Sequence, residues 1–329
     1  MTGISFALSL ILAFGITVIV SHWLIPVLKS HKMGQKILDI GPRWHKSKEG
    51  TPTMGGIAFL VASVLVGAAA IVSISLRGSF RDALPLTLTL AYALLNGLIG
   101  VIDDAAKLRH KQNEGLTAWQ KYVLQFLAAA LYLVAMIRFC GLSTTLRIPF
   151  TDASVDLGWG YYVLAMLLFT GIVNSVNLTD GIDGLCSSVT LIVGVFFSLT
   201  GFLLLENDGL SAIGALLIGS AAGFLVYNFY PARVFMGDTG SLFFGGLVVG
   251  GAFLTGSPLV VVLCGIVYIV ETLSVILQVL YFKLTHGKRL FRMSPIHHHF
   301  EKCGWSEIKI VIVFSLITAV GCAAAYLSF

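Results

Sequence analysis

Residues 184–228 read GLCSSVTLIVGVFFSLTGFLLLENDGLSAIGALLIGSAAGFLVYN and contain two long apolar runs, 184–205 and 210–228. Only the turn-like ENDG separates them. An α-helix needs about 20 consecutive apolar residues to cross the hydrocarbon core of a bilayer. We therefore interpret this stretch as two consecutive membrane-spanning helices.

The same pattern repeats along the chain. Of its 329 residues, 57% are hydrophobic and 11% are charged, whereas soluble domains carry about 25% charged residues. A soluble protein would instead show amphipathic helices or alternating strands. The sequence predicts one all-α, polytopic membrane domain, residues 1–329, whose ninth helix is long enough to be bent, tilted or broken. Its ten apolar runs are 4–28, 53–75, 83–103, 118–139, 159–177, 184–205, 210–228, 239–255, 258–284 and 306–328.

The loops carry an uneven distribution of basic residues. All but four of the 21 Lys and Arg residues fall on one set of alternating loops, the exceptions being Arg77, Arg81, Arg138 and Arg147. Cytoplasmic loops are enriched in Lys and Arg, so the odd-numbered loops are predicted to be cytoplasmic and both termini to lie outside. The formal net charge of +5 then reflects topology, and we expect no nucleic-acid partner.

Polar residues gather in five clusters on the predicted cytoplasmic side. The first is DDAAK, in which Asp103 and Asp104 end the third apolar run and Lys107 follows one turn later. Adjacent ionised carboxylates repel each other, which favours a bound cation. The alternative is a solvated helix end with an Asp104–Lys107 pair, although acids at a helix C-terminus oppose the helix dipole.

The second cluster is NSVNLTDGIDGL, where Asn174, Asn177, Asp180 and Asp183 are spaced by three. They would share one helical face until Gly181 opens the chain. Their oxygens suit Mg²⁺ and the hydrogen-bond donors of a sugar or a base. A turn with Asx caps is the alternative.

The third cluster is YNFYPARVFMGDTGSLFFGG, which places Asp238 where a helix begins. Free N–H groups at a helix N-terminus favour anions, and an aspartate there can hold a metal that carries a phosphate. A simple N-cap is the alternative. In the fourth cluster, HKSKEGTPTMGG, Lys46, Lys48 and Thr53 lie beside a glycine-rich helix start suited to phosphate; charge that only sets topology is the alternative.

The fifth cluster, MSPIHHHFEKCGW at residues 293–305, contains three consecutive histidines. They admit three interpretations: a leftover purification tag, a transition-metal site, or part of an anion-binding surface. Taken together, the five clusters predict a phosphate-rich, water-soluble substrate at one membrane face. The chain contains no Walker loop, so ATP-driven work is not expected.

The stretches GTPTMGG, DDAAK, NLTDGIDGL, FMGDTGS and MSPIHHHFE occur in this order within residues 40–308. In these stretches the chain resembles the phospho-N-acetylmuramoyl-pentapeptide transferases, bacterial members of the polyprenyl-phosphate N-acetylhexosamine 1-phosphate transferase superfamily. The resemblance implies transfer of a phospho-sugar from UDP-N-acetylmuramoyl-pentapeptide to undecaprenyl phosphate, giving UMP and lipid I for peptidoglycan biosynthesis. It also implies a Mg²⁺ cofactor, ten helices, a homodimer, and a plasma-membrane protein whose active site faces the cytoplasm.

Roles for individual residues follow as hypotheses. Asp238 would bind Mg²⁺ with Asn177 as second ligand, Asp103 would deprotonate or orient the lipid phosphate, and Asp104 would shape the same field. A two-step route with Asp103 as nucleophile remains open. The expected substrate-binding residues are Lys48, Thr53, Lys121, Asn174, Asn177, Asp180, Asp183, Asn228, Phe235, Ser294, His297 and His298.

The histidines are then interpreted as substrate-facing. A tag is disfavoured because a full apolar run follows, and a metal site because adjacent side chains on an extended or turning loop diverge. We expect His297 and His298 to donate to the diphosphate while His299 braces the loop against Glu301.

Two alternatives remain besides a structural scaffold, which gives no reason for the aspartate clusters. One is a related transferase that uses UDP-N-acetylglucosamine. The other is a transporter or flippase, which would place ionisable groups near mid-membrane; here only Glu271 does so, and its position has no explanation from sequence.

Overall fold

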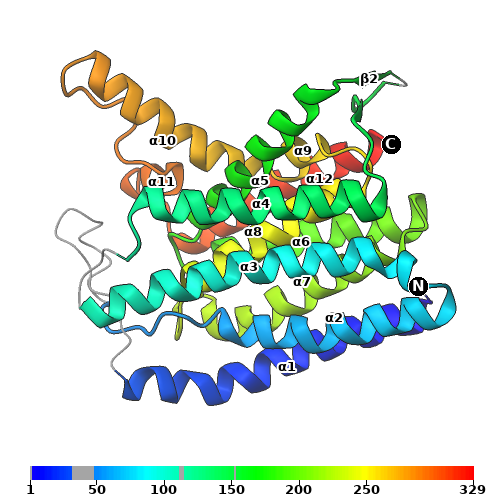
Figure 1. Cartoon of the computed structure of the whole chain (residues 1–329). Helices are drawn as coiled ribbons and strands as arrows, with labels where there is room; N and C mark the ends of the chain where they lie inside the picture. Colours follow the sequence, from blue (N-terminus) through cyan, green and yellow to red (C-terminus); the bar gives the residue numbers. More distant parts are fainter. Residues whose placement is uncertain (1, 32–47, 111–114, 152) are drawn as a thin grey trace.

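The computed structural model describes residues 2–31, 48–110, 115–151 and 153–329; Lys46 of the fourth cluster lies outside them. Within this part the chain is almost entirely helical (Figure 1). The helices are α1 (Gly3–Ser30), α2 (Ile57–Arg77), α3 (Phe80–His110), α4 (Ala118–Cys140), α5 (Trp159–Thr179), α6 (Leu185–Leu199), α7 (Asp208–Asn228), α8 (Gly237–Leu254), α9 (Val260–Cys264), α10 (Ile266–Leu284), α11 (Ile296–Lys302) and α12 (Glu307–Leu327), with a π-helical turn η2 (Thr200–Leu204).

The apolar runs are confirmed as helices. Ten helices of the described chain are long and apolar enough to cross a membrane, and each corresponds to one predicted run. The ninth run is broken, because α9 ends at Cys264 and α10 begins at Ile266. In Figure 1, α10 leans away from the other helices. The sixth run continues from α6 into η2.

Within the described residues, a short hairpin is the one departure from the all-α expectation. Strands β1 (Thr145–Arg147) and β2 (Ser154–Asp156) pair antiparallel, with Leu146 opposite Val155. The pair lies between α4 and α5 and leaves the all-α architecture unchanged.

The centre of the protein is the contact between α3 and α8. Every residue of α8 from Thr239 to Leu254 is buried. Small residues let the two helices approach closely, as is common where helices pack in membranes. A Cβ atom on Gly246 would lie 2.7 Å from the Cα of Ala93, and one on Gly100 would lie 2.4 Å from the carbonyl carbon of Asp238. The close contact therefore extends to the aspartates at one end of both helices.

Both termini lie at the same end of the molecule, as an even number of spans requires. Figure 1 shows N and C at one end, and α11 with the start of α4 at the other. The α11 end carries the predicted cytoplasmic clusters, so the bias in Lys and Arg predicts that the end with the termini is outside.

Cys303 offers a direct test of this orientation, because it is exposed just after α11. A membrane-impermeant maleimide should label it in inverted membrane vesicles and not in sealed right-side-out vesicles. Cys303→Ser should remove that signal. Ser154→Cys, at an exposed position of β2, should show the opposite pattern in the Cys303→Ser background. Labelling of Cys303 in sealed right-side-out vesicles would contradict the topology.

Candidate active site

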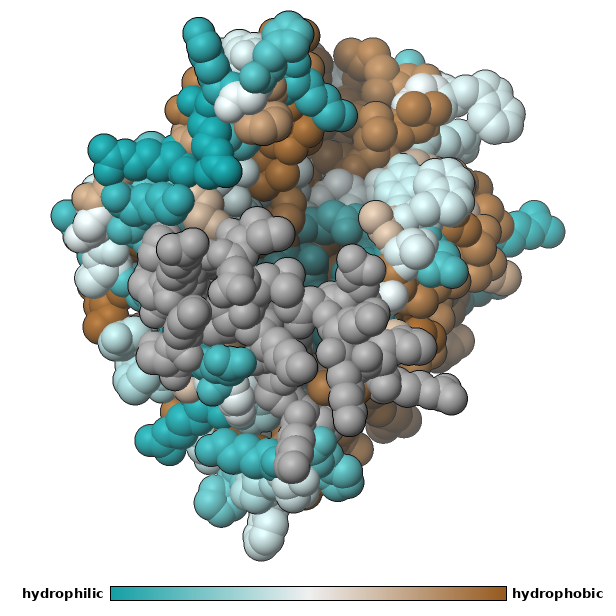
Figure 2. Space-filling model, turned by 90° about the vertical axis from the view of Figure 1, so that its left-hand side faces the viewer, coloured by the Kyte–Doolittle hydropathy of each residue, from teal (hydrophilic) through white to brown (hydrophobic). Residues whose placement is uncertain are grey.

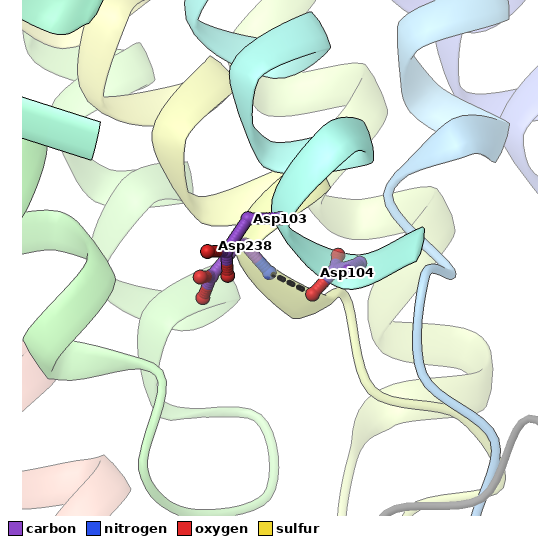
Figure 3. Close-up of side chains that lie close together, drawn as sticks. All are labelled: Asp103, Asp104 and Asp238. Carbon is purple, nitrogen blue, oxygen red and sulfur yellow. Dashed lines mark hydrogen bonds between the residues drawn. The ribbon is translucent and has the colours of Figure 1, made fainter. Parts of the chain in front are cut away.

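Three aspartates from two distant parts of the chain meet where α3 ends and α8 begins (Figure 3). Asp103 and Asp104 belong to α3, and Asp238 lies in the first turn of α8. One oxygen atom from each lies within 4.8 Å of the others. Among the described residues, no other group of three or more His, Cys, Asp or Glu side chains is close enough to share a metal ion.

Asp104 holds the start of α8 in place. It is 2% exposed and accepts hydrogen bonds from the backbone N–H of Asp238 (3.3 Å) and of Thr239 (2.9 Å), and from the Thr239 hydroxyl (2.8 Å). The adjacent Gly237 has φ +68°, a conformation that favours glycine. A Cβ there would also lie 2.5 Å from Asp104 Oδ2. Asp104 therefore supplies the side-chain cap that α8 lacks in its own sequence.

Asp103 and Asp238 share two lysines. The ammonium group of Lys107 lies 2.7 Å from Asp103 Oδ2 and 2.9 Å from Asp238 Oδ2. Lys121, in the first turn of α4, donates a hydrogen bond to Asp238 and lies 3.7 Å from Asp103. From the sequence, Lys107 is expected only as a partner of Asp104, and its ammonium nitrogen lies 3.7 Å from Asp104 Oδ1. Lys107 was therefore missed as a site residue, although it belongs to the DDAAK stretch.

The two asparagines of the second cluster contact different parts of the molecule. The amide nitrogen of Asn177 donates to Asp238 Oδ1 (2.7 Å) and to the Ser241 hydroxyl (2.8 Å). The predicted metal ligand thus lies against the aspartates but presents nitrogen, so its oxygen would have to turn inward to bind a cation. Asn174, one turn away, pairs with Gln125 at 2.6 Å and joins α5 to α4.

Lys48 and Asp183, both predicted to bind substrate, bind each other. The Lys48 ammonium group lies 2.7 Å from Asp183 Oδ1 and 2.7 Å from Glu307 Oε2. The second oxygen of Asp183 accepts the backbone N–H of Ala232 at 2.8 Å. Glu307 also accepts the backbone N–H of Asp183 at 3.0 Å. Glu307 was missed, because nothing in the sequence places the start of α12 beside the first loop.

A hollow of about 310 Å³ opens beside this network. Its lining includes Lys48 and Glu307 with the aromatic side chains of Tyr230 and Trp305. Figure 2 shows a recess with hydrophilic residues inside it on this face of the molecule. The hollow is therefore open at the Lys48 network, and none of the three aspartates lines it.

The segment between α7 and α8 brings the remaining predicted residues together. Phe235 pairs through its backbone with Pro52 (2.8 Å) and Gly55 (2.9 Å), which places Thr53 beside the turn at Gly237. Asn228 is buried, and its amide nitrogen donates to the Val234 carbonyl at 3.0 Å. In this structure Asn228 braces the turn.

The three histidines lie on the short helix α11. This corrects the expected extended or turning loop. His297 is 0% exposed, and its Nδ1 lies 3.0 Å from Oε2 of Glu271. His298 Nδ1 lies 2.6 Å from Glu301 Oε2, so the partner predicted for His299 belongs to its neighbour. His299 does brace the chain, because its Nδ1 accepts the backbone N–H of Arg292 at 3.1 Å.

Ser294 lies just before α11 and is half-buried. The histidine stretch lies between α10 and α12 in the chain and contacts both helices, so it is part of the fold.

Comparisons with known proteins identify the family of the chain. A family model described as Glycosyl transferase family 4 matches residues 86–257, and phospho-N-acetylmuramoyl-pentapeptide-transferase signature 1 matches residues 48–60. The chain is 43% identical to the phospho-N-acetylmuramoyl-pentapeptide-transferase of Clostridium novyi over 97% of its length and 95% of the relative's. It is 44% identical to those of Clostridioides difficile (94% and 93%) and Clostridium acetobutylicum (97% and 98%).

The chain belongs to the phospho-N-acetylmuramoyl-pentapeptide-transferase family. The family signature covers the segment that carries Lys48 and Thr53 and pairs with the backbone of Phe235. The broader family match contains the three aspartates with Lys107 and Lys121. Helix α11 lies outside both matched segments, so its place in the site comes from the structure.

Asp180 lies next to this site in the segment between α5 and α6. Desolvation, together with the negative charges of Asp238, Asp104 and Asp183, raises the pKa of Asp180 to about 8. At neutral pH its carboxyl group therefore carries a proton and can donate a hydrogen bond to a substrate oxygen.

This pKa gives stability a specific pH dependence. Between the usual aspartate pKa and about 8, the folded protein holds a proton that the unfolded chain has lost, so stability falls as pH rises through this window. Asp180→Asn should remove this loss of stability at higher pH. In detergent, its melting temperature should match that of the unaltered protein near pH 4 and exceed it increasingly up to about pH 8. A constant difference across this range would contradict the raised pKa.

Proposed function

We propose that the protein transfers the phospho-N-acetylmuramoyl-pentapeptide group from its UDP-linked donor to undecaprenyl phosphate, giving lipid I and UMP. The reaction would take place at the cytoplasmic face of a bacterial plasma membrane. The observation that carries this proposal is the convergence of Asp103, Asp238, Lys107 and Lys121 at one end of the helices. The full-length similarity to enzymes of this name supports the same substrates.

The proposed chemistry is a displacement at phosphorus. An oxygen of the lipid phosphate forms a bond to the β-phosphorus of the donor, and the bond from that phosphorus to the bridging oxygen breaks. UMP leaves with the electron pair of the broken bond. Because attacking and leaving groups are both anionic, catalysis of this kind depends on positioning and on neutralising charge.

The residues fit a bound Mg²⁺. Carboxylate oxygens are the ligands that Mg²⁺ prefers, and Oδ2 of Asp103 and Oδ2 of Asp238 both face the ammonium groups of Lys107 and Lys121, so they already surround positive charge. Asp238 and Asp103 would hold the ion, with Asn177 as a further ligand if its amide oxygen faces inward. Asp104 is less available, since α8 already occupies both of its oxygens. When bound, Mg²⁺ would supply positive charge to the diphosphate.

The lysines would provide the remaining positive charge. Lys107 and Lys121 lie between Asp103 and Asp238, where an incoming phosphate would compete with the carboxylates for the ammonium groups. Asp103 would orient the lipid phosphate, which is already largely ionised near pH 7 because its second pKa is about 6. Direct inversion at phosphorus would support the one-step route, and a covalent phospho-sugar on Asp103 the two-step route.

Donor recognition would involve the segments beside the aspartates. Phe235 is half-buried and free to stack on uracil with its ring, while its backbone is fixed by the first loop. Protonated Asp180 and the neighbouring Asp183 would contact the nucleoside and the diphosphate. His298, on the half-buried side of α11, remains a candidate donor. A homodimer is also proposed, on the resemblance alone.

The activity can be tested by measuring UMP release from UDP-N-acetylmuramoyl-pentapeptide and undecaprenyl phosphate. Release should require Mg²⁺ and should stop on chelation. Asp238→Asn and Asp103→Asn should each lower turnover by about 10²–10³-fold, with melting temperatures close to that of the unaltered protein. Asp82→Asn, at the opposite end of α3, is the matched control and should keep full activity.

Two results would reject parts of the proposal. Near-normal turnover of Asp238→Asn at saturating Mg²⁺ would reject its role in holding the metal. Faster transfer from UDP-N-acetylglucosamine than from the muramoyl donor would assign the protein to the related transferases.

A further inference from the structure

Glu271 is an ionisable residue in the second turn of an apolar helix, α10. It is 0% exposed. Removing a carboxylate from water is costly unless a partner compensates. The compensating contact comes from His297, also 0% exposed, whose Nδ1 lies 3.0 Å from Glu271 Oε2. None of the four polar atoms of these two side chains makes a hydrogen bond in the described residues, so the 3.0 Å approach of Nδ1 to Oε2 is a close polar contact rather than an aligned hydrogen bond.

The opposite edge of the His297 ring lies against the segment that joins α5 to α6. A Cβ atom on Gly181 would lie 2.2 Å from Nε2 and 2.6 Å from Cε1 of His297. Only a glycine permits this approach without a shift. The imidazole is thus held between a carboxylate on α10 and the backbone between Asp180 and Asp183, two residues that the proposed function places on the donor.

Helix α10 is itself fixed relative to the site. The Thr272 hydroxyl donates to the Ser175 hydroxyl at 2.7 Å, and Ser175 lies two residues before Asn177 on α5. At its other end, Gln278 Oε1 accepts the backbone N–H of Phe291 at 2.8 Å, in the segment that leads to α11. The helix that carries Glu271 is therefore hydrogen-bonded both to α5 and to the segment that precedes α11.

We propose that Glu271 is a positioning residue for the transferase reaction. Its carboxylate places the proton of His297 on Nδ1, and holds the ring against Gly181 with Nε2 towards the Asp180–Asp183 segment. The tautomer of a histidine is set by the partner of its other nitrogen, as in metal sites and hydrolases. This contact fixes α11 and the Asp180–Asp183 segment relative to each other. Its kinetic consequences rest on the proposed function, whereas the tautomer does not.

The kinetic test compares Glu271→Met, Glu271→Gln and the control Thr318→Val, which removes a buried hydrogen bond within α12. Loss of the partners that orient a functional group commonly lowers activity or affinity by about 10–100-fold. Glu271→Met should lower kcat/KM for the UDP-linked donor in this range by raising the donor KM, while the KM for undecaprenyl phosphate stays unchanged. Glu271→Gln keeps an oxygen that can accept from Nδ1 and should recover part of the loss. Thr318→Val should behave like the unaltered protein.

The structural test follows the imidazole directly. With ¹⁵N-labelled histidine in detergent micelles, the His297 signal, assigned by its absence in His297→Asn, should report a proton on Nδ1. That signal should change in Glu271→Met. Gly181→Ala should change it as well, because its methyl group would displace the ring from the other side.

Specific outcomes would overturn the positioning role. One is an activity loss in Glu271→Met with both KM values unchanged and a matching fall in folded protein, which would make Glu271 merely structural. Another is an unchanged His297 signal in both Glu271 variants. If the unaltered protein does not use the muramoyl donor, the proposed function fails, and the histidine signals still decide the positioning role.

Discussion

The carboxylate of Asp104 accepts the first N–H groups of α8, a helix that starts more than a hundred residues later in the chain. The interaction joins the end of α3 to the beginning of α8 and thereby places Asp238 beside Asp103. It is possible only because Gly100 and Gly237 let the backbones meet there. Lys107, Lys121 and Asn177 make their contacts with these two aspartates. The junction therefore determines the geometry of the whole site.

The charges at the junction suggest why acids would line a site that is proposed to bind phosphates. Asp103, Asp104 and Asp238 carry three negative charges, while Lys107 and Lys121 supply two positive ones. A diphosphate and a lipid phosphate would add further negative charge to a partly buried space, where repulsion is weakly screened. The proposed additional cation would make such an assembly favourable. Under that proposal the acidic residues act as ligands for the metal, rather than as groups that contact phosphate themselves.

The sequence predicted the membrane architecture well because the bilayer acts as a solvent with a fixed thickness. A length of apolar chain is enough to define each span, and even the break near Gly265 could be anticipated from an overlong run. The pairings between spans were not predictable. Lys107 reaching Asp238, Glu307 reaching Lys48, and Asn228 turning inward to the Val234 carbonyl depend on which helix faces which. The apolar pattern contains no such information, because the lipid-facing and protein-facing sides are both hydrophobic.

The three histidines show what a motif leaves undetermined. On a helix, successive side chains point in different directions, so His297, His298 and His299 meet Glu271, Glu301 and the Arg292 backbone respectively. One residue faces inward, one is paired beside the hollow, and one braces the preceding segment. The three histidines are therefore not equivalent donors, because each has a different partner. Glu271, which alone suggested a transport path, belongs to the same arrangement, because its carboxylate contacts His297 on α11.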